Sequence, residues 1–239
     1  RDYQQGLAEY RAGRVEASYP LLRGAYAACP ANTRYRNDLI LAAAGAGHAA
    51  EALAIGAPLD PVALPVYVLE ALARAARDTH QPDLAVRYYD VILGSGENIG
   101  ASVGRDLAQI DRGNAREAQT DLQALRVRYP ERVDVLEALG LADEAVGETV
   151  PALAAAEALL AMDPQHAGGQ RLRFRMLAAL GAPQLALALT PESLVSPGQR
   201  GWAMQDALAL EFRWARDGPG NGRERADQLD AVIHRMRAT

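Results

Sequence analysis

The residue types that most often carry out catalysis or bind metals are few in this sequence and lie far apart. The four histidines, His48, His80, His166 and His234, have no second metal ligand at a useful spacing, and no two of them are four residues apart. We expect them to be exposed and structural. The single cysteine, Cys29, lies between two alanines and a proline with no histidine beside it, so we expect an inert, partly buried thiol. The sequence therefore predicts no catalytic residue, no metal site and no enzymatic activity.

One glycine-rich run, residues 94–100, has the composition of a phosphate-binding loop. It lacks the lysine and the serine or threonine that such a loop needs, and no strand pattern precedes it, so we interpret it as a loop between helices. The chain has 25 basic and 30 acidic residues among 239, a net charge of −5, whereas proteins that bind the phosphate backbone are normally basic. We therefore expect neither a cofactor nor a nucleic-acid partner.

An internal repeat predicts which elements hold any functional residue. A small residue recurs at separations of 34, 33, 33, 34 and 34, at Ser18, Ala52, Ala85, Ala118, Ala152 and Ala186. Five residues before each of these lies a turn position, occupied by Gly13, Gly47, His80, Gly113, Gly147 and Gly181. Glycine suits a left-handed backbone at a tight turn between two helices, and five of the six positions hold it.

Prolines and apolar spacing agree with the same register. Pro30, Pro130 and Pro164 fall twelve residues after their small residues, where they would end a second helix, and Pro82 and Pro183 fall three residues before theirs, at a first helical turn. Apolar residues between these markers have helical spacing, for example Leu69, Leu72, Ala73 and Ala76, and strand-like alternation is absent.

Two repeats depart from the pattern. Pro58, Pro61 and Pro65 predict that the closing helix of the second repeat is short and is followed by an extended linker. The fourth repeat carries Arg105 and Asp106 where packing residues should lie, after several glycines, which predicts a displaced or irregular first helix.

This combination of turn glycine, small residue, closing proline and period resembles tetratricopeptide repeats. The resemblance implies an all-α superhelix, an α-solenoid of about six helix-turn-helix repeats over residues 1–195. Beyond it, Ser196, Pro197 and Gln199 predict a helix start, and a last helix is expected from about Arg223 to Arg237. We expect residues 196–239 to form a capping pair of helices.

In tetratricopeptide arrays the first helix of each repeat lines the concave side, which is the usual binding surface of a solenoid. Counting from the small residues places a mixed but locally acidic set there in repeats three to five. The candidate ligand-binding residues are Tyr67, Glu70, Arg74, Asp78, Asp111, Asp134, Glu137 and Glu144.

A second resemblance covers roughly a quarter to a third of the chain, in residues 168–189, 191–215 and 223–236. These segments are similar to the periplasmic repeat domain of PgaA-type outer-membrane exporters of poly-β-1,6-N-acetylglucosamine. The resemblance implies a periplasmic domain that engages the partially deacetylated exopolysaccharide and its periplasmic deacetylase. In that family a β-barrel follows the repeats. It is absent from this chain, which opens on Arg1 instead of a methionine, so we expect an excised domain of an outer-membrane protein.

Charge is consistent with that interpretation, because acidic groove residues would attract the ammonium groups of a deacetylated polymer and lose that attraction in salt. The alternative is a protein–protein adaptor in another envelope assembly, such as a secretion complex or a cellulose or alginate exporter. A peptide partner would depend more on apolar positions such as Leu107 and Ile110.

Overall fold

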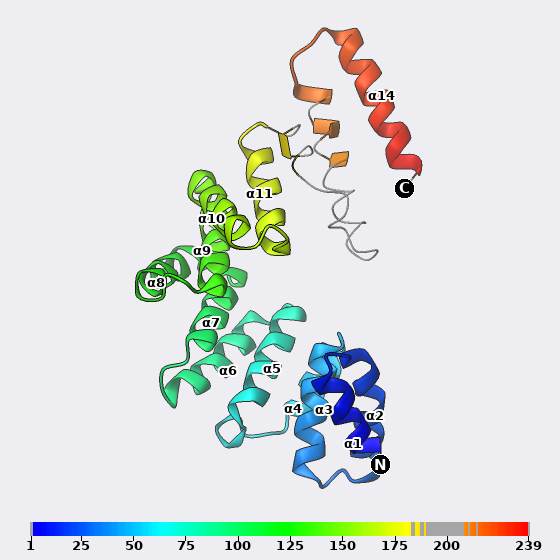
Figure 1. Ribbon diagram of the computed structural model, residues 1–239, viewed down its shortest axis with the longest axis vertical. Coiled ribbons are helices and arrows are strands. Elements are labelled where there is room, and N and C mark those ends of the chain that lie inside the picture. Colours follow the sequence, from blue (N-terminus) through cyan, green and yellow to red (C-terminus); the bar gives the residue numbers. More distant parts are fainter. Residues whose placement is uncertain are drawn as a thin grey trace. The chain divides into compact units, whose positions relative to one another are not determined.

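The computed structural model describes residues 2–182, 185–186, 189, 208–209, 211–213 and 215–238, with side chains up to Ile233, and these residues form helices and turns without a strand (Figure 1). The chain divides into two compact units, Arg1–Leu125 and Arg126–Thr239, and each is described by itself. In the described part of the chain, no helix is both long enough and apolar enough to cross a membrane.

The first unit is a succession of helical hairpins. Each helix from α1 to α6 packs against the next, and α1, α3 and α5 each also contact the first helix of the following hairpin, α3, α5 and α7. This is the packing of an α-solenoid, in which each repeat buries its apolar face against its neighbour. The helices are α1 (Asp2–Arg11), α2 (Val15–Ala28), α3 (Thr33–Gly45), α4 (Ala49–Gly56), the 3₁₀ turn η1 (Pro61–Ala63), α5 (Val66–Asp78), α6 (Pro82–Gly94), α7 (Ile99–Asp111) and α8 (Ala115–Arg128), whose last three residues fall in the second unit.

The second unit continues the same arrangement. Helix α9 packs against α10, α10 packs against α11, and α9 also contacts α11. Its described helices are α9 (Val133–Ala145), α10 (Thr149–Met162), α11 (Ala167–Ala179) and α14 (Gly222–Ala238). The predicted all-α solenoid is thereby confirmed.

The turns between paired helices adopt the backbone conformation that the repeat pattern predicts. All six turn positions have positive φ, from 56° at His80 to 91° at Gly113. The residue that follows each turn donates its backbone N–H to a carbonyl five residues earlier, as in the 2.8 Å bond from Gln81 to Ala76 and the 2.8 Å bond from Glu148 to Asp143. These bonds satisfy carbonyls at the helix end that would otherwise lack partners.

The small residues are buried, as the pattern predicts. Each of the six is at most 1% exposed: Ser18, Ala52, Ala85, Ala118, Ala152 and Ala186. The closing prolines follow the ends of α2, α8 and α10, and Pro82 is the first residue of α6. Pro183 lies outside the described residues.

The second repeat has the short closing helix that its prolines predict. Helix α4 has eight residues, whereas α6 has 13, and η1 follows it in the linker to α5. Leu59 and Leu64 of this linker pack against the core of the first unit. These linker side chains therefore cover part of the core that a longer α4 would cover.

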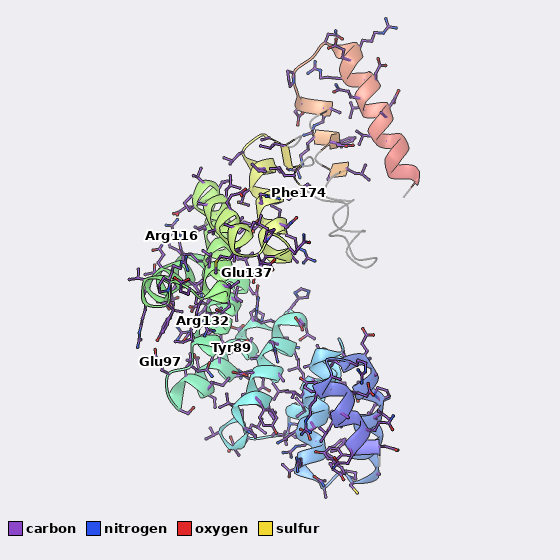
Figure 2. All side chains as sticks on the ribbon, in the orientation of Figure 1. Tyr89, Glu97, Arg116, Arg132, Glu137 and Phe174 are labelled. Atoms are coloured by element: carbon purple, nitrogen blue, oxygen red, sulfur yellow. The ribbon has the colours of Figure 1, made fainter. Side chains whose placement is uncertain are left out.

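The prediction of an irregular first helix in the fourth repeat is wrong. Helix α7 is continuous over 13 residues and is capped by Asn98, whose side chain accepts the N–H of Ala101 at 2.9 Å. Gly104 lies against the buried ring of Tyr89 (labelled in Figure 2), so the glycine provides space for close packing of α6 and α7. Gly104 and the charged residues Arg105 and Asp106 thus all lie inside a regular helix.

At the C-terminus, the predicted last helix is present as α14. The side chain of Asn221 accepts the N–H groups of Arg223 and Glu224, and Glu224 accepts the N–H of Asn221, which is a capping box. The expected helix start at Ser196 lies outside the described residues. The division into repeats over 1–195 and a capping pair over 196–239 stays a prediction.

Candidate functional site

Four of the candidate residues lie along one side of α5. Tyr67, Glu70, Arg74 and Asp78 are spaced by three or four residues, which places them on a single helical face. We call these four residues the α5 face. Tyr67 is 42% exposed, Arg74 and Asp78 are exposed, and Glu70 is half-buried, while the intervening Val68, Leu72 and Ala76 form the core.

Glu70 makes one cross-repeat contact from this face. The side-chain amide of Asn98, which caps α7, donates a hydrogen bond of 3.5 Å to Glu70 Oε1. Asn98 is neutral, so the contact leaves the charge of Glu70 in place. Behind the α5 face, burial raises the pKa of the Tyr89 phenol, which keeps that group in its neutral form.

The C-terminal ends of α5 and α7 are joined by an ion pair. Arg77 Nε donates to Asp111 Oδ2 at 2.7 Å, across a separation of 34 residues, or one repeat. Arg77, Asp78, His80, Pro82 and Asp111 together line a hollow of about 520 Å³. Two predicted site residues, Asp78 and Asp111, therefore line the same hollow.

In the second unit, two of the three acidic candidates are paired with arginine. Arg132 binds Asp134 through two hydrogen bonds of 2.9 and 2.5 Å, and this bonding lowers the pKa of the Asp134 carboxyl. Arg175 binds Glu144 in the same forked geometry, with both bonds at 2.6 Å. Much of the negative charge predicted for α9 is thus neutralised locally.

Glu137 differs from these two residues. Within the described part of the chain its carboxylate has no ion-pair or hydrogen-bond partner, and it lies close to Gly168 at the start of α11 (Figure 2). A Cβ added at Gly168 would overlap Glu137 Oε1 and lie 2.8 Å from its carboxyl carbon. Glycine at this position therefore makes room for the carboxylate.

Three histidines have described side chains, of which His48 and His80 are exposed, as the sequence predicts, whereas His166 is half-buried. His48 stacks on Tyr19 with ring centroids 4.0 Å apart, and the Nδ1 atom of His166 accepts the N–H of Gly169 as the cap of α11. The side chain of His234 lies outside the described part. No group of three potential ligands capable of holding a metal occurs among the residues that are described.

The expectation of a partly buried thiol at Cys29 is wrong. Cys29 is exposed at the C-terminal end of α2, where the backbone N–H satisfies carbonyls of the helix and the side chain faces solvent.

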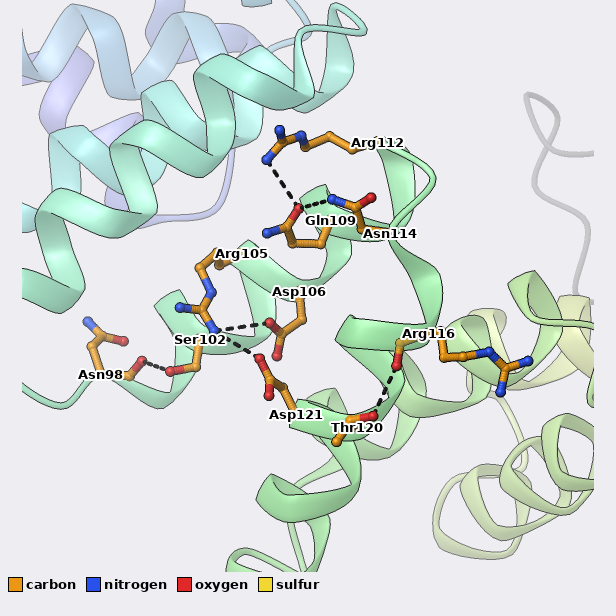
Figure 3. Close-up of polar contacts among 10 residues, drawn as sticks. All are labelled: Asn98, Ser102, Arg105, Asp106, Gln109, Arg112, Asn114, Arg116, Thr120 and Asp121. Atoms are coloured by element: carbon orange, nitrogen blue, oxygen red, sulfur yellow. Dashed lines mark hydrogen bonds and ion pairs between the residues drawn. The ribbon is translucent and has the colours of Figure 1, made fainter.

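The sequence pattern did not predict a charged cluster of α7 and α8 that surrounds the buried Asp106 (Figure 3). Asp106 is 1% exposed, and Arg105 contacts both Asp106 at 3.5 Å and Asp121 of α8 at 3.2 Å. Burial raises the pKa of Asp106 to about 7, with the charge of Arg105 opposing that rise and Asp121 adding to it. The residue types were visible in the sequence, but the approach of Asp121 depends on the packing of α8.

Comparison with known proteins gives the fold and no closer relationship. No protein-family model matches the sequence, and no curated protein matches it. A tetratricopeptide repeat protein from Parabacteroides merdae superimposes with a TM-score of 0.64 at 17% identity, covering 97% of each chain. A structure of MamA from AMB-1 superimposes with a TM-score of 0.50 at 20% identity, covering 65% of this chain and 93% of MamA. Together with the six turns and buried small residues, these matches show that the chain has the tetratricopeptide repeat fold.

Proposed function

We propose that this chain is a non-enzymatic periplasmic scaffold of an exopolysaccharide exporter. In this role it binds partially deacetylated poly-β-1,6-N-acetylglucosamine and docks the deacetylase that produces it. Arrays of this fold typically act as scaffolds that bind their partners along an extended surface. The polysaccharide assignment goes further than the fold and depends on the chemistry of the α5 face.

The observation that carries the proposal is the sequence of groups on the α5 face. The exposed ring of Tyr67 offers an apolar surface for the C–H face of a sugar, and Glu70 and Asp78 on the same side have no arginine partner in the described part. Arg74 lies one helical turn from each of them, so the α5 face carries two carboxylates and one guanidinium, and its net negative charge can attract the ammonium group of a deacetylated sugar. Glu137 offers the same chemistry in the second unit.

Weak binding at each sugar is compatible with export. A flexible polymer loses conformational freedom when it binds, and a protein that guides a polymer must release it. Several shallow contacts give useful total affinity through their number without holding any one sugar tightly.

The experiment that tests the proposal is a titration with β-1,6-linked glucosamine oligomers, fully acetylated and partly deacetylated, at two salt concentrations. We expect only the deacetylated oligomer to bind, with affinity that falls as salt rises. Glu70→Gln and Glu137→Gln should each lower the affinity roughly twofold to fivefold, which is the scale of an exposed charge contact. Glu16→Gln on the exposed side of α2 is the matched control and should leave it unchanged.

A second candidate function is that of a protein–protein adaptor in another envelope assembly. It is favoured by the partly exposed apolar side chains Leu107 and Ile110 on α7 and by the arginine pairs that neutralise Asp134 and Glu144. If this candidate is correct, Leu107→Ser should weaken capture of a purified partner protein, and glucosamine, cellulose and alginate oligomers should all fail to bind at millimolar concentration. Capture of the deacetylase together with binding of the deacetylated oligomer supports the exporter instead.

A further inference from the structure

The hollow at the ends of α5 and α7 has the size of a small binding site and is lined mainly by charged and polar side chains. Its volume of about 520 Å³ lies within the range of pockets that hold small ligands. All of its lining residues, Arg77, Asp78, His80, Pro82 and Asp111, belong to the first compact unit. The hollow lies at one end of the α5 face and shares Asp78 with it.

The charges in the hollow leave one carboxylate unbalanced. Arg77 and Asp111 satisfy each other through the 2.7 Å hydrogen bond, with side chains 26% and 40% exposed. Asp78 has no hydrogen-bond or ion-pair partner within the described part of the chain. The formal charges of Arg77, Asp78 and Asp111 therefore sum to one negative charge, which favours a ligand with a single positive charge.

His80 places a side chain at the edge of the hollow, whereas the equivalent turns have none. It is the only non-glycine residue with positive φ among the described residues, whereas the five equivalent turns use glycine. A residue with a Cβ is disfavoured in this left-handed conformation relative to glycine, so the turn itself gains nothing from histidine. The imidazole and the ring of Pro82 line the hollow beside Asp78.

We propose that this hollow binds the ammonium group of a single deacetylated glucosamine unit. The Asp78 carboxylate accepts hydrogen bonds from the ammonium group, and the rings of His80 and Pro82 contact the body of the sugar. This inference rests on the proposed function, since it assigns one sugar subsite within the exporter's binding surface. An acetylated unit has no positive charge for Asp78, so the subsite selects deacetylated units.

The test follows the full chain by NMR while the deacetylated β-1,6-linked glucosamine oligomer is added. The imidazole signals of His80, assigned by their loss in His80→Gly, should shift with the sugar concentration, and the acetylated oligomer should leave them in place. Asp78→Asn should reduce the affinity at least about fivefold. His80→Gly should also weaken binding while keeping the turn, because glycine occupies the equivalent position in the other five repeats.

The matched control is Asp90→Asn on the exposed surface of α6, away from the hollow, which should bind as the unchanged chain does. If the chain binds the oligomer but Asp78→Asn has no effect and the His80 signals stay still, the subsite is wrong while the proposed function stands. If the chain binds no oligomer at all, the proposed function fails and the subsite with it. A lysine-containing peptide that shifts the His80 signals more strongly than the sugar would overturn the sugar assignment.

Discussion

Asp106 shows how a single buried residue can influence the stability of a repeat. It lies inside α7 and is packed at 1% exposure. Its Oδ2 atom has no hydrogen-bond partner, and neither has the buried Nε atom of Arg105. Ionising a carboxyl in such a place is costly, because the neighbouring guanidinium compensates only part of the lost hydration.

We predict that this residue makes folding less favourable as the pH rises. The pKa of Asp106 is about 7 in the folded chain, and an aspartate in an unfolded chain has a pKa of about 3.9. The folded state therefore binds this proton more tightly than the unfolded state does. Below about pH 4 the ionisation of Asp106 does not reduce the free energy of unfolding, and that free energy falls as the pH rises to about 7. Asp106→Asn removes this dependence and should be more stable than the unchanged chain at pH 8 by a clearly larger margin than at pH 5.

Urea unfolding of both chains at the two pH values measures this difference. Asp90→Asn, an exposed substitution of the same type, should give the same small change at both. An equal effect of Asp106→Asn at pH 5 and pH 8 would show that Asp106 is already ionised without cost in the folded chain.

At the scale of helices, close packing depends on where glycine allows two helices to approach. A Cβ added at Gly104 would lie 2.6 Å from Cε1 of the Tyr89 ring, which is 4% exposed and cannot move freely. A Cβ added at Gly24, in the middle of α2, would have no heavy atom of another helix within 4 Å. The two glycines are therefore a matched pair for the same substitution.

We predict opposite effects of alanine at these two positions. Gly104→Ala should lower the free energy of unfolding by about 1–3 kcal/mol, because the methyl group forces α6 and α7 apart. Gly24→Ala should raise it by up to about 1 kcal/mol through the better helix propensity of alanine. Thermal unfolding of both variants checks the prediction, and a stabilised Gly104→Ala would mean that Tyr89 repacks without cost.

The sequence predicts the turns and the small residues of the repeats, but not the side-chain contacts between helices. Turns and small residues are set by local backbone conformation and by a fixed period, so Gly47 and Ala52 could be assigned before any contact was known. The register also placed Arg77 and Asp111 one repeat apart, but nothing in the pattern indicated that they would pair. The environment of Asp106 could not be read from the sequence, because it depends on how α7 packs and on Asp121 of α8, which Arg105 holds nearby through a 3.2 Å ion pair. Composition and period carry no information on such side-chain geometry.

At the scale of the whole chain, each compact unit has its own buried core. Leu72 of α5 is fully buried in the first unit, and Leu159 of α10 is 1% exposed in the second. Repeat proteins gain stability from individual repeats and from contacts between neighbours, so a local defect need not unfold the entire array.

We therefore predict that the two units unfold in separable steps. Leu72→Ala should cost the first unit about 2–5 kcal/mol and lower the urea midpoint at which its backbone amides lose protection from hydrogen exchange, while the amides of α9 and α10 keep their midpoint. Leu159→Ala is the matched control and should move the transition of the α9 and α10 amides instead. Coincident shifts of both transitions in both variants would mean that the units unfold as one cooperative body. Separate transitions would allow the α5 variants to be tested for binding while the second unit stays folded as an internal reference.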